Sequence, residues 1–294
     1  MTGPAITWQS DVAPLCRVLL KHARDAFLGP RRIDEQWRAL GYLAVPVYDA
    51  ACRESDALAA LLERLGVVVE WMPPEDIGMD SIYVRDASLV CDGGAIACRM
   101  GKAARAPEPD ALARRYAGLG VPVLGAIEPP GTLEGGDAVW LDSATLVVGR
   151  GYRTNDAGLE QLRAMLGHGV DVIDVPLPHW KGPSDVFHLM SMLSPLAEDL
   201  VLVYSRLLPV PFRELLLRRG MTLVEVPEPE FESMACNVLA VAPRVAIALD
   251  GNPETRRRMR TAGVEVHTYV GQEISAKGCG GPTCLTRPLE RERS

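Results

Sequence analysis

The sequence lacks long apolar runs and blocks of basic residues. Hydrophobic residues make up 48% of the 294 residues, but no apolar segment approaches the roughly 20 residues that cross a membrane. The formal net charge is −7, and the arginine run 256–258 falls on an expected helix, where it would form a solvated face. A negatively charged chain without a basic patch is poorly suited to nucleic acid or to an anionic membrane surface. We expect neither as a partner.

Export signals and a disulfide framework are also missing. Residues 1–7 contain neither the charged nor the apolar region of a signal peptide. The seven cysteines are an odd number and lack framework-like spacing, so we expect reduced thiols. Cys279 and Cys284 are not spaced like a usual zinc-binding pair. The sequence predicts a cytoplasmic protein, and it indicates no metal and no cofactor. It leaves the oligomeric state open, including a homo-oligomer.

The most informative feature present is a fivefold repeat. Five helix-like segments each run into a glycine and then directly into a short apolar strand. The glycines are spaced by 43 to 54 residues, at Gly66, Gly120, Gly167, Gly220 and Gly263. Glycine at such a position is typical of a left-handed helix C-cap, because it has no Cβ. A repeat of this length predicts a radial or solenoid array of similar units.

Three strand-like runs lie between one helix-like segment and the next. They include Ser81–Cys91 in the first unit and Val186–Leu193 in the third, while the last unit has only Val264–Val270 and Leu285–Arg287. The N-terminal segment has two spare runs, at 17–20 and 43–48. The simplest closure places an N-terminal strand in the last unit, which leaves no open sheet edge. We therefore predict a single α/β domain over residues 1–294, with a frayed polar tail at 288–294.

Each unit also carries a polar cluster at the same phase, 14 to 21 residues after its glycine. The clusters are Tyr83–Asp86, Leu133–Asp137, Phe187–Leu189, Ala235–Asn237 and Pro282–Cys284. Residues at the same phase of a radial repeat face the same place. An acid, a second acid, a histidine, an asparagine and a cysteine are therefore expected in one site.

These clusters resemble the motifs of a known superfamily. The relevant segments are Met79–Asp86, Leu133–Asp137, Gly151–Asn155, Phe187–Leu189 and Gly280–Cys284, and Val12–Leu20 looks like the family's first strand. Together they resemble the guanidine-modifying enzymes, or penteins, which include arginine deiminases, amidinotransferases and dimethylarginine dimethylaminohydrolases. The resemblance implies a pseudo-symmetric propeller of five ββαβ blades around a central substrate cavity. The repeat gives the same number of units.

The resemblance implies a covalent mechanism that uses three residues. An arbitrary cysteine is more often a small buried hydrophobe, but Cys284 follows a glycine turn at the functional phase and matches the family's nucleophile. A guanidinium bound beside its sulfur would favour the thiolate that attacks the guanidine carbon. His188 would act as general acid and then as general base. Glu134 would orient His188, hydrogen-bond a guanidinium nitrogen, or do both.

The remaining candidates concern substrate binding. Asp86 is the other acid that could hold a planar guanidinium, because carboxylates match its N–H fork. By resemblance, Arg99 and Arg153 grip the substrate α-carboxylate and Asp80 meets its α-ammonium. Asn237 is interpreted as a hydrogen-bonding residue of the cavity. The implied partner is a small guanidino amino acid.

Two positions depart from patterns within the superfamily. Deiminases and amidinotransferases usually carry His-x-Asp, whereas Met190 stands at that position here and favours the dimethylarginine hydrolases. Those hydrolases often have Glu-Asp where this chain has Arg85-Asp86, and the arginine would change the charge beside the bound cation. The roles of Arg85 and Cys279 stay open.

The sequence predicts a thiol-dependent amidine hydrolase, with N,N-dimethylarginine and water giving citrulline and dimethylamine. Arginine deimination or amidino transfer is the alternative among enzymes. Two alternatives from other classes also remain. One is a non-catalytic homologue that binds an arginine derivative, and the other is a metal-binding protein using Cys279, Cys284 and His188.

Overall fold

The computed structural model describes residues 8–183, 185 and 187–292. Residues 1–7, on which the expectation of no signal peptide rests, lie outside the described residues. So do residues 293–294 of the predicted tail, and residues 184 and 186, the second of which begins a predicted strand. No helix in the described part of the chain is long and apolar enough to span a membrane.

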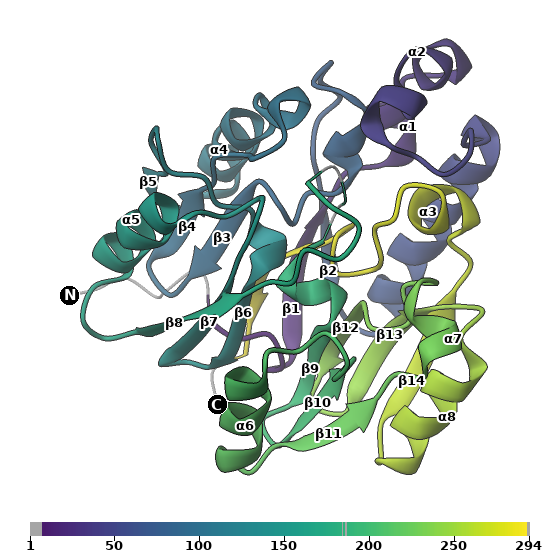
Figure 1. Ribbon diagram of the computed structural model, residues 1–294. Helices are drawn as coiled ribbons and strands as arrows, with labels where there is room; N and C mark the ends of the chain where they lie inside the picture. Colours follow the sequence, from purple (N-terminus) through teal and green to yellow (C-terminus); the bar gives the residue numbers. More distant parts are fainter. Residues whose placement is uncertain (1–7, 184, 186, 293–294) are drawn as a thin grey trace.

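The strands of the described chain form five three-stranded sheets (Figure 1). The sheets are β3 (Ser88–Cys91), β4 (Gly94–Ala97) and β5 (Val123–Ala126); β6 (Ala138–Asp142), β7 (Thr145–Arg150) and β8 (Asp171–Pro176); β9 (Leu193–Ala197), β10 (Leu200–Val203) and β11 (Thr222–Glu225); β12 (Val238–Ala242), β13 (Val245–Leu249) and β14 (Glu265–Tyr269); and β15 (Arg287–Arg291), β1 (Leu15–Leu20) and β2 (Val68–Trp71).

Every sheet has the same pairing. The first two strands pair antiparallel, and the third lies parallel to the second. A parallel neighbour requires a crossover connection, which a helix supplies in each unit. The five crossover helices are α3 (Tyr48–Arg64), α4 (Glu108–Leu119), α5 (Asp156–Leu166), α6 (Val210–Arg218) and α8 (Pro253–Thr261). The fold is therefore the predicted five-bladed ββαβ propeller.

The glycine-terminated helices predicted by the repeat are confirmed. All five repeat glycines have a positive φ, at 84°, 71°, 70°, 77° and 84° in chain order. A side chain there would be strained, which explains why each helix ends at glycine. Figure 1 shows these helices on the outside and the strands towards the middle of the ring.

An N-terminal strand closes the ring, as predicted. β1 pairs antiparallel with β15 and parallel with β2. The prediction of a frayed tail from residue 288 is wrong, because residues 287–291 form β15. In that strand Pro288 and Leu289 are buried between β1 and the core. Pairing with β1 and burial of four of its five residues order a segment whose composition alone is polar.

Four strand predictions also need correction. The run Leu285–Arg287 contributes only Arg287, the first residue of β15. Residues 43–47 form no strand, and α3 already begins at Tyr48. The runs Ser81–Cys91 and Val186–Leu193 contribute only their ends to β3 and β9, because short 3-10 turns occupy Met79–Ile82 and Leu189–Ser191. Most residues of these two turns are buried, and a short buried run looks the same in a strand or a turn.

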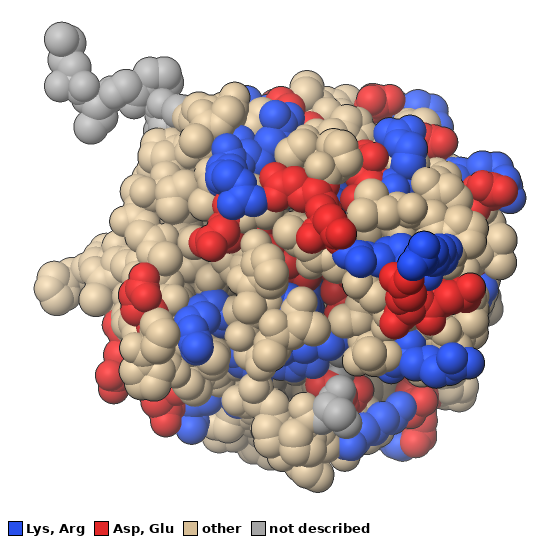
Figure 2. Space-filling model, turned by 90° about the horizontal axis from the view of Figure 1, so that it is seen from above, with Lys and Arg blue, Asp and Glu red and all other residues tan. Residues whose placement is uncertain are grey.

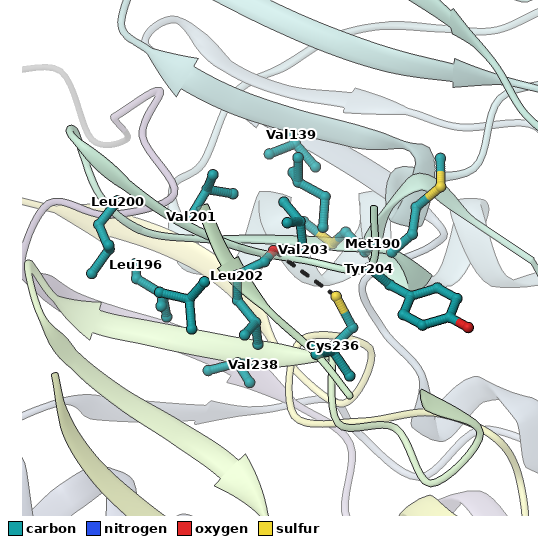
Figure 3. Close-up of a cluster of buried hydrophobic side chains, with 14 of the residues drawn as sticks. Val139, Met190, Leu196, Leu200, Val201, Leu202, Val203, Tyr204, Cys236 and Val238 are labelled. Atoms are coloured by element: carbon teal, nitrogen blue, oxygen red, sulfur yellow. Dashed lines mark hydrogen bonds between the residues drawn. The ribbon is translucent and has the colours of Figure 1, made fainter. Parts of the chain in front are cut away.

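The remaining helices are α1 (Ala23–Phe27), α2 (Pro30–Leu40) and α7 (Glu228–Phe231). The main apolar cluster lies between neighbouring blades (Figure 3). Within it Val201 and Val203 of β10 lie towards Val139 of β6, and Leu202 lies on the other side of the strand towards Val238 of β12. On the face of the molecule seen in Figure 2, basic and acidic side chains are interspersed.

Candidate active site

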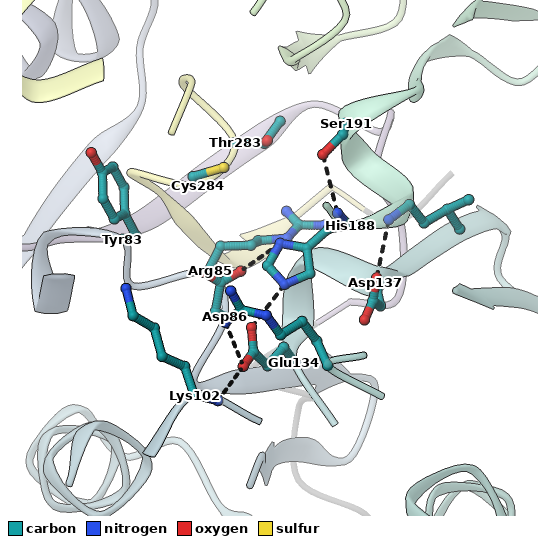
Figure 4. A network of polar contacts seen from close by, with 12 residues as sticks. Tyr83, Arg85, Asp86, Lys102, Glu134, Asp137, His188, Ser191, Thr283 and Cys284 are labelled. Carbon is teal, nitrogen blue, oxygen red and sulfur yellow. Dashed lines mark hydrogen bonds and ion pairs between the residues drawn. The ribbon is translucent and has the colours of Figure 1, made fainter. Parts of the chain in front are cut away.

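A cavity of about 300 Å³ brings most of the predicted site residues together. Asp80, Asp86, Arg153, His188, Asn237 and Cys284 all line it. Glu134 is fully buried directly behind this lining. Figure 4 shows how Asp86, Glu134, His188 and Cys284 converge from loops of different blades.

His188 and Glu134 form a direct pair. His188 lies at the start of the 3-10 turn that precedes β9, and Glu134 lies just before the turn Gly135–Asp137 that leads into β6. The Nε2 atom of His188 is 2.8 Å from Oε2 of Glu134. The structure thus places Glu134 where it can orient the imidazole.

The glycines after Glu134 allow this close approach. A Cβ atom on Gly136 would lie 2.7 Å from both Oδ1 of Asp86 and Nδ1 of His188. Any side chain at this position would push the acid and the imidazole away from each other. The Gly135-Gly136 pair therefore has a direct role in the geometry of the site.

Asp86 is held on one side and free on the other. Its Oδ2 accepts a hydrogen bond from Arg105 at 2.6 Å, and Arg105 also binds both oxygens of Glu108 at 2.9 and 2.7 Å. The other oxygen, Oδ1, is buried, has no hydrogen-bond partner among the described residues, and lies 3.9 Å from Nδ1 of His188. A buried acceptor left unpaired in this way is available to a donor on a ligand.

Cys284 is positioned by Asn237. The amide Nδ2 of Asn237 donates to Sγ of Cys284 at 3.3 Å, and its Oδ1 accepts from the backbone N and the hydroxyl of Thr283 at 3.1 and 2.7 Å. The glycine turn before the cysteine packs directly on neighbouring side chains. A Cβ on Gly281 would collide with Asn237, and one on Gly280 would collide with the ring of Tyr83.

Electrostatics sets opposite protonation preferences for these groups. Burial alone would lower the pKa of His188, but the charges of Asp86 and Asp137 and the contact with Glu134 outweigh it and raise the pKa to about 9. Burial would raise the pKa of Glu134, yet its hydrogen bond with His188 and the charge of His188 lower it to about 2. Burial and then the charge of Asp86 raise the pKa of Cys284 to about 11. At pH 7 these shifts favour an imidazolium at His188 and a neutral thiol at Cys284.

Two of the predicted substrate-binding residues, Arg153 and Arg99, lie in different places. Arg153 lines the cavity, and its hydrogen bonds to the described residues are long, at 3.5 Å to Oε1 of Glu134 and at 3.4 Å to the carbonyl of Asp185. Arg99 is not among the residues that line the cavity. Its Nη1 donates to the carbonyl of Gly131 at 3.0 Å, so the structure does not bring it to the site.

Arg85 points away from the cavity. Its side chain is 2% exposed and pairs with Asp11 at 2.8 Å. The neighbouring Asp86 faces the cavity, so the side chains of these two consecutive residues lie on opposite sides of the backbone. The sequence led us to expect that Arg85 changes the charge beside a bound cation. The structure shows that it does not, because its side chain is paired with Asp11.

Sequence reasoning missed two cations of the cavity wall, Lys102 and Arg105. Both follow β4, whereas the polar clusters of the repeat precede the first strand of each hairpin, so the phase of the repeat does not indicate them. The wall also contains the aromatic residues Trp180, Phe187 and Phe231, to which the sequence assigned no role. Their positions in loops and in the short helix α7 give no sequence signal for a cavity.

One group in the described part of the chain could offer three ligand atoms to a metal ion. The donor atoms of Asp86, Glu134 and His188 lie within 4.8 Å of one another. Two of these residues already bind each other, and the guanidinium of Arg105 lies against the third. The set Cys279, Cys284 and His188, considered from the sequence, does not form such a group.

Comparison with known proteins decides the family. Residues 34–291 match the family model described as N,N dimethylarginine dimethylhydrolase, eukaryotic. The N(G),N(G)-dimethylarginine dimethylaminohydrolase of Streptomyces coelicolor is 34% identical over 238 residues, which cover 80% of this chain and 84% of that protein. The chain belongs to the dimethylarginine dimethylaminohydrolase family. It is accordingly a hydrolase that acts on C–N bonds of amidines.

Other relatives of this family member span the superfamily. An arginine deiminase of Listeria welshimeri is 26% identical over 253 residues, or 71% of this chain and 61% of that protein. The structure of a dimethylarginine dimethylaminohydrolase variant from Pseudomonas aeruginosa, complexed with citrulline, has a TM-score of 0.76 at 24% identity and covers 95% of this chain and 100% of that one. An amidinotransferase from Microseira wollei has a TM-score of 0.80 at 17% identity, covering 99% of this chain and 98% of that one. These structures share the pentein fold.

Proposed function

We propose that this protein hydrolyses N-methylated arginines, with N,N-dimethylarginine giving citrulline and dimethylamine through a covalent intermediate on Cys284. The observation that carries the proposal is the convergence, in one cavity, of the Cys284 thiol, the His188–Glu134 pair and the unpaired Oδ1 of Asp86. A thiol, a general acid and base, and a free carboxylate oxygen are the groups that cleavage of a guanidinium requires.

Binding of the cationic substrate starts the reaction. The guanidinium donates to Oδ1 of Asp86, which gives that buried acceptor its missing partner. The same positive charge lowers the pKa of Cys284 from its raised value, because an adjacent cation favours the thiolate. The Cys284 thiol, whose raised pKa keeps it neutral at pH 7, thus becomes a thiolate nucleophile when the substrate guanidinium binds beside it.

The chemistry then proceeds in two halves. The Cys284 thiolate bonds to the guanidine carbon, and the resulting tetrahedral adduct receives a proton on its dimethylamino nitrogen from the His188 imidazolium. The C–N bond breaks, dimethylamine leaves, and an S-alkylthiouronium cation remains on Cys284. His188, now neutral, accepts a proton from the water that attacks this carbon. Collapse breaks the C–S bond and releases citrulline and the thiolate.

The preference for methylated nitrogen rests on an apolar part of the wall. Met190 lines the cavity at the position, two residues after the histidine, where deiminases and amidinotransferases usually have an acid. Phe187 adds a second apolar side chain to the lining. An unmethylated nitrogen would bring additional N–H donors, and each buried donor without an acceptor costs about 1–3 kcal/mol. A dimethylated nitrogen has no such donors and adds apolar contact.

Direct competition between arginine and N,N-dimethylarginine tests the proposal. Purified protein is incubated with both substrates, and citrulline, ammonia and dimethylamine are quantified. We expect a higher kcat/KM for dimethylarginine, with citrulline matched by dimethylamine. A preference for arginine with release of ammonia would identify a deiminase, and binding without any turnover would identify a non-catalytic homologue.

A further inference from the structure

Lys102 lies where the resemblance places a group of the substrate. Its Nζ is 2.7 Å from Oδ2 of Asp80 and 2.7 Å from the carbonyl oxygen of Leu40. Asp80 is the acid that was expected to meet a substrate α-ammonium. Both Lys102 and Asp80 line the cavity, and Figure 4 shows Lys102 beside the cluster formed by Asp86 and Glu134.

Lys102 and Asp80 form a largely buried ion pair in the wall of the cavity. The side chains of Lys102 and Asp80 are 20% and 8% exposed, so water screens the ion pair only in part. The backbone of Lys102 is anchored as well, because its N–H donates to Oε1 of Glu134 at 3.3 Å. An ammonium from the substrate would meet the like charge of Lys102 beside Asp80, and it would find Oδ2 of Asp80 and the carbonyl oxygen of Leu40 already engaged.

At the same end of the cavity, the cationic side chains of Arg153 and Lys102 could bind a substrate carboxylate. Arg153 and the backbone of Lys102 both contact Oε1 of Glu134, which places them on the same side of this carboxylate. The hydrogen bonds of Arg153 are long, so its guanidinium retains capacity for a bidentate carboxylate. Lys102 adds a second positive charge there and neutralises Asp80.

We propose that Lys102 replaces the substrate α-ammonium on Asp80, so that this enzyme also accepts N-methylated ω-guanidino carboxylates, which have no charged α-amine. The inference rests on the proposed function, because it concerns the far end of the same substrate. Recognition at that end then depends on the carboxylate, through Arg153 and Lys102. The α-amine contributes little to transition-state binding.

The test compares N,N-dimethylarginine with its deamino analogue, 5-(N′,N′-dimethylguanidino)pentanoate, by release of dimethylamine. We expect the ratio of the two kcat/KM values in the unaltered protein to stay below about tenfold, the size of one charge-assisted hydrogen bond. In Lys102→Met, Asp80 becomes free for an ammonium while the carboxylate loses a cation. The ratio should then rise at least about tenfold in favour of dimethylarginine.

Lys277→Met is a matched control. Its Nζ also binds a carboxylate and a carbonyl, with Glu273 at 2.6 Å and Val45 at 2.9 Å, but Lys277 is not among the residues that line the cavity. The ratio should not change in this variant. Asp80→Asn provides a second arm that does not depend on the folding of Lys102→Met, and it should also leave the ratio unchanged.

Several results would overturn the inference. A preference of tenfold or more for dimethylarginine in the unaltered protein would show that the α-ammonium is recognised. If Asp185→Asn abolished that preference, the cavity-lining Asp185 would be its binding partner instead. A selective loss of dimethylarginine turnover in Asp80→Asn, or an unchanged ratio in Lys102→Met, would remove the role of Lys102. Turnover of neither substrate would instead refute the proposed function.

Discussion

The imidazole Nε2 of His188 lies 2.8 Å from Oε2 of Glu134, although the two residues are 54 positions apart in the sequence. The contact joins the loops that precede β6 and β9, so two neighbouring blades contribute to one acid–base unit. Nε2 is occupied by this contact, and Nδ1 faces Asp86. Proton transfer to and from substrate is therefore assigned to the Nδ1 side of the ring.

The pKa of His188 should fall in Glu134→Gln, because the variant removes one of the carboxylates that hold the imidazolium. We expect a decrease from about 9 towards the ordinary value of about 6.5, measured by NMR titration of the histidine ring. Glu35→Gln, which alters an exposed acid paired with Arg31, is the control and should have no effect. An unchanged His188 titration in Glu134→Gln would contradict the assignment.

The same pair predicts the pH dependence of stability. The pKa of folded His188 lies above its ordinary value, so its contribution is complete below about pH 6.5 and is lost as the pH rises through 9. The pKa of Glu134 lies below its ordinary value, so its contribution is present above about pH 4.3 and is lost as the pH falls towards 2. Denaturant unfolding at several pH values should show that Glu134→Gln loses most stability between these limits.

Cys284→Ser should abolish turnover, because a serine hydroxyl is a far weaker nucleophile than a thiolate at neutral pH. An acid-quenched reaction of the unaltered protein should yield a thiouronium adduct on the peptide that contains Cys284, detected by mass spectrometry. Cys279 also lines the cavity and provides the control. Cys279→Ser should retain most of the activity, and equal losses in the two variants would undo the assignment.

Arg153→Ala should raise KM for substrates with an α-carboxylate and have little effect on agmatine, which lacks one. The reason is that Arg153 lines the cavity with a weakly engaged guanidinium. Arg99→Ala is a matched control, since Arg99 binds the carbonyl of Gly131 away from the cavity lining. Steady-state kinetics with dimethylarginine and agmatine would decide, and a larger KM effect for Arg99 would reverse the assignment.

Arg85→Met should destabilise the protein without changing the rate per folded molecule. Its guanidinium pairs with buried Asp11, and its removal leaves that carboxylate without its hydrogen-bonded ion-pair partner. The expected loss is about 3 to 5 kcal/mol in the free energy of unfolding, measured by denaturant titration. Arg31→Met, which removes an exposed pair with Glu35, should cost at most about 1 kcal/mol. A lower kcat in Arg85→Met at full folding would assign Arg85 to the site.

Local chemistry explains why the repeat could be predicted. The left-handed conformation at Gly66 or Gly220 strongly favours a residue without a Cβ, and the amphipathic helix before it is periodic in sequence. Such signals depend on neighbours within one turn of the chain. The phase of His188 and Cys284 relative to these glycines then predicted a shared site, because like positions in a radial repeat face the same cavity.

Tertiary packing decided what the sequence left open. Arg85 and Asp86 are adjacent, yet one is buried against Asp11 and the other faces the cavity. Residues 287–291 are polar in composition, yet they form β15 because β1, nearly the whole chain away, supplies hydrogen-bonding partners for them. Neither outcome has a signal within a few residues of the position concerned.

By itself the sequence determined the five units, the glycine that ends each helix, and the meeting of the acid, histidine, asparagine and cysteine. Only the tertiary structure decided which cationic side chains line the cavity where these residues meet. Lys102 binds Asp80 and Arg99 turns away, because the path of the chain after β4 sets the direction of each side chain. The direction of a side chain in a turn depends on the residues that contact it. Here these are Leu40, Gly131 and Glu134, which come from distant segments of the chain.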